Sequence, residues 1–103
     1  DITAVIVDSD YKAVQVLSVL KNMGKRVPED VSLTCLSGSY LTDIPTPRIY
    51  SMKPDNSQIG EMAANRLIDI IEGRTENAQQ NVYADYVIEE GDSFRRLTEE
   101  SYG

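Results

Sequence analysis

The chain has 103 residues, of which 41% are hydrophobic and 26% are charged, so it has the size and composition of one small folded domain. Ten Lys and Arg against seventeen Asp and Glu give a net charge of -7, which argues against binding nucleic acid or an anionic membrane by bulk electrostatics. The lack of histidine excludes Ser-His and Cys-His catalysis and His-ligated metal sites, and a single cysteine excludes an internal disulfide. No apolar run approaches the ~18 residues of a membrane span, and the first residues do not resemble a secretion signal. The single cysteine fits a reducing cytoplasm, where we expect this protein.

The first predicted elements are a strand and a helix. Residues 2–7 read ITAVIV, a short apolar run that favours a strand covered on both faces, as in a parallel sheet. The polar residues 8–10 are expected to cap a helix over 11–23, whose wide apolar surface predicts cover on more than one side. Gly24 predicts the end of this helix, and residues 27–30 predict a turn because proline disfavours helix there.

The middle of the chain predicts a second strand and a long loop. Residues 31–36 form a buried-strand candidate that holds Cys35, which we interpret as a small buried hydrophobic side chain. Residues 37–47 are rich in Ser, Thr, Asp, Gly and Pro and predict a loop, and residues 48–52 predict an extended segment between two prolines.

The last third predicts one more helix and one more strand. Asp55 followed by Gln58 is typical of a capping box, and apolar residues at helical spacing continue the helix until Gly73. A polar loop is expected next, then a strand over 82–88. The acidic residues 89–103, with one weak helical stretch, are interpreted as a solvated tail.

This order of elements predicts an α/β fold with a mostly parallel sheet. Ligands of such folds bind beyond the carboxyl ends of the strands, where residues 8–10 and 37–40 are expected to lie. If the first two strands are neighbours, these two loops face one crevice. Ser9 and Asp10 are therefore candidates to line a ligand site, and simple helix capping is the alternative interpretation.

Several ordered stretches resemble the carboxyl-terminal portion of the effector domain of the LacI/GalR family of transcriptional regulators. The resemblance covers roughly residues 2 to 90, and its most specific part is the segment GKRVPEDVS at 24–32. The other matching stretches are AVIVDSD at 4–10, TP at 46–47, KP at 53–54, IGEMAA at 59–64 and DYVI at 85–88.

The resemblance implies a partial periplasmic-binding-protein-like (Rossmann-like) fold, with residues 1–103 as a fragment of a two-subdomain effector domain. It implies that the DNA-binding helix-turn-helix and most of the effector domain precede Asp1. A small sugar or sugar derivative would bind between the subdomains, and their closure would control operator binding by a homodimer. No cofactor, metal or membrane partner is implied. The effector-binding candidates are Ser9, Asp10 and Ser37, and the candidate dimer-interface residues are Tyr11, Val14, Gln15, Ser18, Tyr40 and Leu41.

Four positions depart from the family pattern. Ser9 stands where the family has Asn, Ser37-Gly38 replace an Asp pair, and Glu89 stands where a basic residue is common. In relatives the first Asp of that pair binds hydroxyls of the effector, so the usual sugar anchor is absent here. Ser37 carries no charge, so we hypothesise a phosphorylated or carboxylated sugar, or a bulkier ligand, rather than a neutral hexose bound in the usual way.

Two alternative functions are considered. One is a periplasmic sugar-type solute receptor, which shares the fold. The other is a haloacid-dehalogenase-like phosphatase in which Asp8 attacks phosphorus and Asp10 acts as general acid and base. The phosphatase is disfavoured because Tyr11-Lys12 does not match its motif and no second acidic motif follows a later strand.

The tyrosines are a further set of candidates for ligand stacking. Taken singly, each is interpreted as an aromatic side chain at the edge of the core. These residues are Tyr40, Tyr50, Tyr83 and Tyr86.

Overall fold

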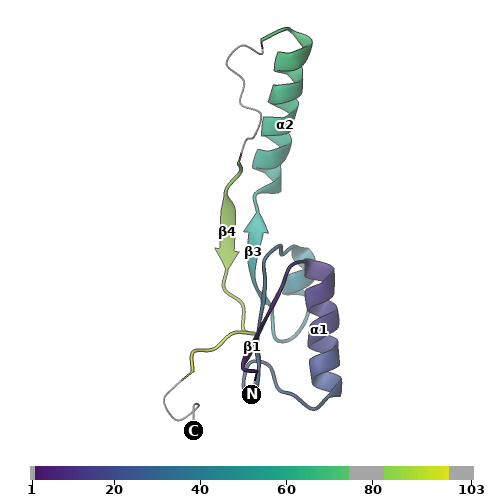
Figure 1. The fold of residues 1–103 in the computed structure, drawn as a ribbon, viewed down its shortest axis with the longest axis vertical. Helices are drawn as coiled ribbons and strands as arrows, with labels where there is room; N and C mark the ends of the chain where they lie inside the picture. Colours follow the sequence, from purple (N-terminus) through teal and green to yellow (C-terminus); the bar gives the residue numbers. More distant parts are fainter. Residues whose placement is uncertain (1, 75–82, 98–103) are drawn as a thin grey trace. The chain divides into compact units, whose positions relative to one another are not determined.

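The computed structural model describes residues 2–74 and 83–97 (Figure 1). Its elements follow the predicted order, with one short 3-10 helix, η1, inside the segment predicted as a loop. In chain order they are β1 (Ala4–Val7), α1 (Asp10–Asn22), β2 (Ser32–Cys35), η1 (Tyr40–Asp43), β3 (Tyr50–Pro54), α2 (Asn56–Ile71) and β4 (Tyr86–Glu89). In the part of the chain that is described, neither long helix has the length and apolar character that a membrane span requires.

The chain divides into two compact units. Unit 1 comprises residues 1–53 and 88–103, and unit 2 comprises residues 54–87. The chain therefore leaves unit 1 once, after Lys53, and returns to it once, at Ile88.

The strands form one sheet in the order β1-β2-β3-β4. The first three strands are parallel, with Val7 opposite Cys35 and Cys35 opposite Ser51. The arrow of β4 points against that of β3 in Figure 1. The prediction of an α/β fold with a mostly parallel sheet is confirmed.

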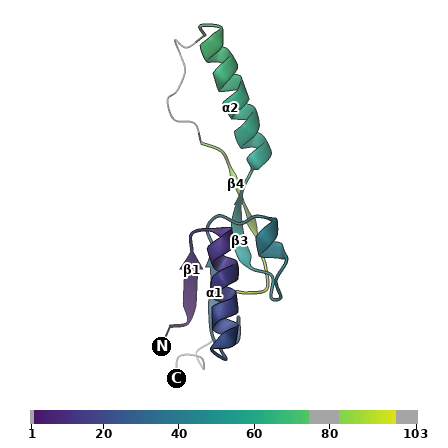
Figure 2. The same ribbon diagram turned by 90° about the vertical axis from the view of Figure 1, so that its right-hand side faces the viewer.

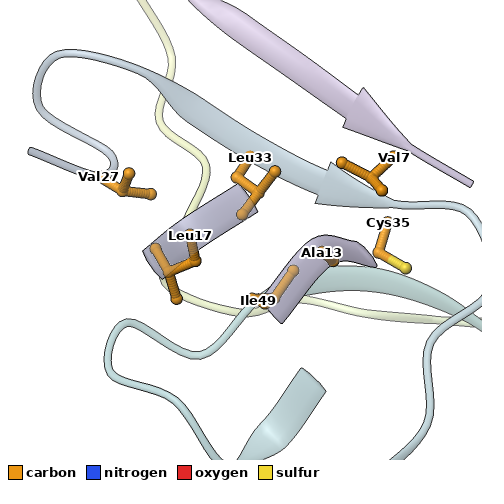
Figure 3. Close-up of a cluster of buried hydrophobic side chains, with 7 residues drawn as sticks. All are labelled: Val7, Ala13, Leu17, Val27, Leu33, Cys35 and Ile49. Atoms are coloured by element: carbon orange, nitrogen blue, oxygen red, sulfur yellow. The ribbon is translucent and has the colours of Figure 1, made fainter. Parts of the chain in front are cut away.

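The core of unit 1 lies between helix α1 and one face of the sheet. Figures 1 and 2 show α1 running alongside the strands of this unit. Ala13 and Leu17 are the buried residues of α1, and Leu33 of β2 is fully buried (Figure 3). The complete cluster is Val7, Ala13, Leu17, Val27, Leu33, Cys35 and Ile49. Cys35 is 1% exposed, so its interpretation as a buried hydrophobic side chain is confirmed, and this burial raises the pKa of its thiol.

Two predictions about burial are wrong for the described residues. The first strand was expected to be covered on both faces, but Ile6 is 69% exposed. Successive strand residues point to opposite faces, and α1 packs only on the face of Val7. The first helix was expected to be covered on more than one side, but Tyr11 and Met23 are 64% and 65% exposed.

The ends of the helices follow the predicted signals. Gly24 and Gly73 adopt φ values of +78° and +77°, the left-handed conformation that commonly follows a helix. Asp55 caps α2 by accepting a hydrogen bond from the backbone N–H of Gln58 at 3.1 Å. The Gln58 side chain does not complete a capping box, because its Oε1 accepts the backbone N–H of Asp85 at 2.8 Å instead.

Unit 2 consists of α2 and the segment that leads into β4. None of the residues of α2 is buried, although the helix carries the predicted apolar periodicity. The strand predicted over 82–88 begins later, at Tyr86, and most of the predicted loop over 74–81 lies outside the described residues.

The segment after β4 contradicts the prediction of a solvated tail. Ser93 is completely buried, and its backbone C=O accepts the N–H of Leu33 at 2.9 Å. The Ser93 hydroxyl donates to the C=O of Leu33 at 2.5 Å and accepts the N–H of Tyr50 at 2.8 Å. Ser93 therefore joins β2 to β3. No helix forms over residues 90–97, and the remainder of the predicted tail lies outside the described residues.

Arg95 stabilises the turn within the segment GKRVPEDVS at residues 24–32. Its guanidinium donates to the C=O of Pro28 at 3.1 Å and of Glu29 at 2.8 Å. Within the same turn, Asp30 accepts the backbone N–H of Arg26 at 2.7 Å. The turn is thus stabilised from within by Asp30 and from outside by Arg95, which lies in the segment after β4.

Candidate functional site

The two candidate ligand loops lie together, as predicted from the topology. Strands β1 and β2 are parallel neighbours, so the residues that follow them share one edge of the sheet. The hydroxyl of Ser39 donates to Oδ2 of Asp10 at 2.6 Å and links the two loops directly.

Asp10 is the charged centre of this edge. Its Oδ1 accepts the backbone N–H of Tyr11 at 2.6 Å at the start of α1. The hydrogen bond from Ser39, followed by that from the Tyr11 N–H, holds the pKa of Asp10 below its ordinary value. Asp10 is therefore a carboxylate at neutral pH, fixed in place by two donors.

Replacing Ser39 by alanine is expected to raise the pKa of Asp10 toward its ordinary value, because the strongest donor to the carboxylate is lost. A folded-state pKa below the unfolded one contributes stability that is present above the unfolded pKa and is lost as pH falls through the folded one. The Ser39→Ala variant should therefore lose part of the acid sensitivity of folding. This effect is small, on the order of a few tenths of a kcal/mol, because Asp10 is partly exposed to solvent.

An NMR titration of the Asp10 carboxyl carbon measures this shift directly. Ser37→Ala is the matched control, since Ser37 lies in the same loop and is exposed. An unchanged Asp10 titration in the Ser39→Ala variant would contradict the assigned role of that hydrogen bond.

Ser9 and Ser37 supply uncharged hydroxyls at the same edge. Ser9 occupies the position before α1 with φ -132° and ψ 156°, but its side chain makes no capping hydrogen bond. The interpretation of Ser9 as a side-chain helix cap is therefore wrong. The next residue after Ser37, Gly38, donates its N–H to the C=O of Met52 at 2.7 Å, which anchors this loop to β3.

The position of Gly38 leaves no space for a larger residue. A Cβ at this position would lie 2.5 Å from the Cβ of Ser51, a separation that real structures avoid. The close approach of the loop to β3 therefore requires glycine at this position.

The candidate dimer-interface residues lie on two neighbouring elements of unit 1, because α1 and η1 are in contact. Tyr11 of α1 and Tyr40 of η1 are 64% and 73% exposed. Val14 differs from the others because it packs against the core cluster. Gln15 and Ser18 are exposed on α1, and Leu41 is half-buried.

The tyrosines do not share one environment. Tyr50 is partly buried and stacks in a tilted arrangement on Phe94, with ring centroids 5.6 Å apart. Tyr40, Tyr83 and Tyr86 are mostly exposed, so the prediction that they lie at the core edge is wrong for them. Tyr83 and Tyr86 line a groove of unit 2 together with Ile59, Met62, Ala63, Arg66 and Ala84. The sequence pattern does not predict this groove, because its lining comes from α2 and from residues 83–86, and periodicity does not show which distant segments lie together.

The arrangement of Asp8 and Asp10 does not strengthen the phosphatase alternative. Asp8 is ion-paired with Lys12 at 3.3 Å, one helical turn along, and Asp10 already accepts two hydrogen bonds. Within residues 2–74 and 83–97, no three potential ligand side chains gather in a way that could hold a metal ion.

Comparisons with known proteins identify the family and the fold of this chain. The family model described as "Periplasmic binding protein-like domain" matches residues 2–94. The HTH-type transcriptional regulator CelR of Thermobifida fusca is 33% identical over 75 residues, which are 73% of this chain and 22% of that protein. The chain thus spans about a fifth of the length of the curated relatives it matches.

Two solved structures show the same fold. A complex of the transcriptional regulator CelR with cellobiose has a TM-score of 0.82 and 28% identity, covering 90% of this chain and 28% of that chain. A LacI family regulator from Bifidobacterium animalis subsp. lactis DSM 10140 has a TM-score of 0.82 and 28% identity, covering 93% of this chain and 35% of that chain. The chain belongs to the family of periplasmic binding protein-like domains, and its resemblance to the effector domains of LacI-type transcriptional regulators is confirmed.

Proposed function

We propose that this chain is the carboxyl-terminal portion of the effector-sensing domain of a LacI/GalR-like transcriptional regulator. The observation that carries the proposal is the joined pair of loops at the carboxyl edge of β1 and β2, in a chain whose family model spans residues 2–94. In the full-length protein this edge forms part of the binding site for a small sugar or sugar derivative. Occupation of the site biases closure of the effector domain and thereby operator binding.

The similar proteins favour a regulator over the two alternatives. CelR of Thermobifida fusca is an HTH-type transcriptional regulator, and one of the similar solved structures is a complex of a transcriptional regulator CelR with cellobiose. We infer a cytoplasmic homodimer without catalytic activity, which contacts operator DNA through a separate DNA-binding domain. The net charge of -7 supports DNA binding by a separate domain, because the phosphate backbone of DNA repels an acidic segment.

Ser9, Asp10 and Ser37 are the proposed effector contacts. Ser9 is available for this role because its hydroxyl does not cap α1. The carboxylate of Asp10 accepts hydrogen bonds from sugar hydroxyls while Ser39 and the Tyr11 N–H hold it in place. Ser37 is uncharged, so an anionic group of the ligand, a phosphate or a carboxylate, belongs near Ser37 and away from Asp10.

Isothermal titration of the full-length regulator with cellobiose, glucose and glucose 6-phosphate tests this proposal. Ser9→Ala and Ser37→Ala should each weaken binding of the preferred sugar about tenfold, the effect of one lost hydrogen bond to a ligand. Ser57→Ala is the matched control, because Ser57 is an exposed residue of α2.

The charge of the ligand is tested by Ser37→Asp. This variant should weaken glucose 6-phosphate at least tenfold, since a carboxylate would then face the phosphate. Tight binding of a neutral monosaccharide, unchanged by Ser37→Ala, would contradict the proposed ligand class. Absence of binding to any sugar of a wider panel would contradict the proposed function itself.

A further inference from the structure

Three charged side chains from three elements meet in unit 1. The Nζ of Lys53, near the end of β3, donates to Oδ2 of Asp43 at 2.5 Å. The same Nζ lies 3.4 Å from Oε2 of Glu89, at the end of β4. Asp43 is the last residue of η1, so a single ammonium group connects η1, β3 and β4.

This cluster stands where the chain passes between the two units. Lys53 is the last residue of unit 1 before the chain leaves it, and Glu89 is the second residue after the chain returns. A basic side chain at position 89 would repel Lys53 instead of pairing with it.

The Lys53 pairs are less exposed to solvent than the Lys12–Asp8 pair. The side chain of Lys53 is 18% exposed and those of Asp43 and Glu89 are 38% and 43% exposed, whereas those of Lys12 and Asp8 are 61% and 69% exposed. Burial lowers the pKa of Lys53, but the hydrogen bonds and charges of Asp43 and Glu89 outweigh burial and leave its pKa raised. Lys53 is therefore charged at neutral pH, and its pairs are screened less by solvent than an exposed pair is.

Hydrogen bonds connect this cluster to the candidate effector site. Ser39 donates to Asp10 and also accepts the N–H of Leu41, so it begins η1 while holding the site together. η1 ends at Asp43, which binds Lys53. The path from Asp10 to Lys53 is thus a short series of direct contacts within one unit, the kind of connection through which coupling can act.

We propose that the two ion pairs of Lys53, with Asp43 and with Glu89, make η1, the end of β3 and the end of β4 move as one body. These two ion pairs are called the lock. The lock gives a ligand-induced displacement of the loop at residues 37–47 a direct route to both chain segments that cross between the units. This regulatory use rests on the proposed function, whereas the lock itself does not.

Amide hydrogen exchange of the intact, ligand-free protein tests the lock, with variants that open its two arms separately. Asp43→Asn removes the negative charge of the arm to η1 and should accelerate exchange at least fivefold at the N–H of Gly38, which bonds to the C=O of Met52. Glu89→Gln removes the arm to β4 and should do the same at the N–H of Asp92, which bonds to the C=O of Arg48.

Lys53→Met keeps the aliphatic stem and removes the charge, so it should accelerate exchange at both Gly38 and Asp92. Lys53→Arg restores the charge and should restore protection. Lys12→Met is the matched control, because it removes an exposed ion pair of the same kind and should change neither amide.

Two results would overturn the lock. One is that Lys53→Met accelerates the core amide of Leu33 as much as those of Gly38 and Asp92, which would indicate general destabilisation. The other is that its exchange pattern equals that of Lys12→Met. Since no ligand is used, a protein that binds no sugar still gives a clear outcome, and failure of the proposed function stays distinguishable from failure of the lock.

Discussion

Replacing Gly91 by alanine is expected to lower the free energy of unfolding by about 3 kcal/mol, near the upper end of what overpacking costs. A Cβ at this position would lie 2.7 Å from the backbone N of Tyr50 and 2.7 Å from the carbonyl carbon of Ile49. Both are backbone atoms that enter β3, so they cannot rotate away as a flexible side chain can. Gly91 does not have a positive φ, so lack of space, and not backbone strain, is the cause.

Gly60→Ala is the matched control for Gly91→Ala. Gly60 lies inside α2, and a Cβ there would meet no atom within 4 Å. Alanine should therefore raise the stability of the helix by about 0.5–1 kcal/mol, the difference in helix propensity between the two residues. Urea denaturation followed by circular dichroism should show the two variants moving in opposite directions. A Gly91→Ala variant as stable as the parent would contradict the close approach of the two segments.

The sequence predicts the order of elements well because local rules decide them. Apolar β-branched runs give β1 and β2, glycine in the left-handed conformation ends both helices, and Asp55 begins α2 as its side chain predicts. The neighbouring positions of the loops after β1 and β2 also follow, because a parallel sheet places the ends of its strands at one edge.

The predictions fail where the structure depends on contacts between distant segments. Ser93 lies in an acidic stretch without periodicity, and no local signal shows that it bonds to Leu33 and Tyr50. Burial is predicted poorly for a related reason. The apolar run that contains Ile6 and the apolar face of α2 have patterns typical of covered surfaces. Within the described residues, however, Ile6 and the residues of α2 are not buried. A pattern indicates that an apolar face needs a partner, but not which segment supplies it.

The site is predictable in position but not in its internal bonds. Ser9, Asp10 and Ser37 lie at the predicted edge because topology determines it. The hydroxyl that binds Asp10 comes from Ser39, which belongs to the predicted ligand loop but is not one of the predicted effector contacts. Spacing along the chain cannot distinguish which of several serines in a loop faces a given carboxylate, since loop conformation depends on anchors such as the Gly38 N–H.

Ser93→Ala is expected to lower the free energy of unfolding by about 2–3 kcal/mol. The hydroxyl of Ser93 is fully buried, and its loss leaves the N–H of Tyr50 and the C=O of Leu33 without this partner. Each buried polar group left unsatisfied costs about 1–3 kcal/mol, which outweighs the small gain from removing one hydroxyl. Chemical denaturation of the protein measures the loss, with Ser57→Ala on the exposed surface of α2 as the control.

Gly91→Ala and Ser93→Ala together test whether the close packing of Gly91 and the hydrogen bonds of Ser93 depend on each other. Gly91→Ala leaves the Ser93 hydroxyl in place but pushes the whole segment away from β3, so its cost should include that of the lost Ser93 bonds. The double variant Gly91→Ala/Ser93→Ala should then cost less than the sum of the single variants. Strict additivity would show that Gly91 and Ser93 act independently, and would contradict a single docked segment that joins β2 to β3.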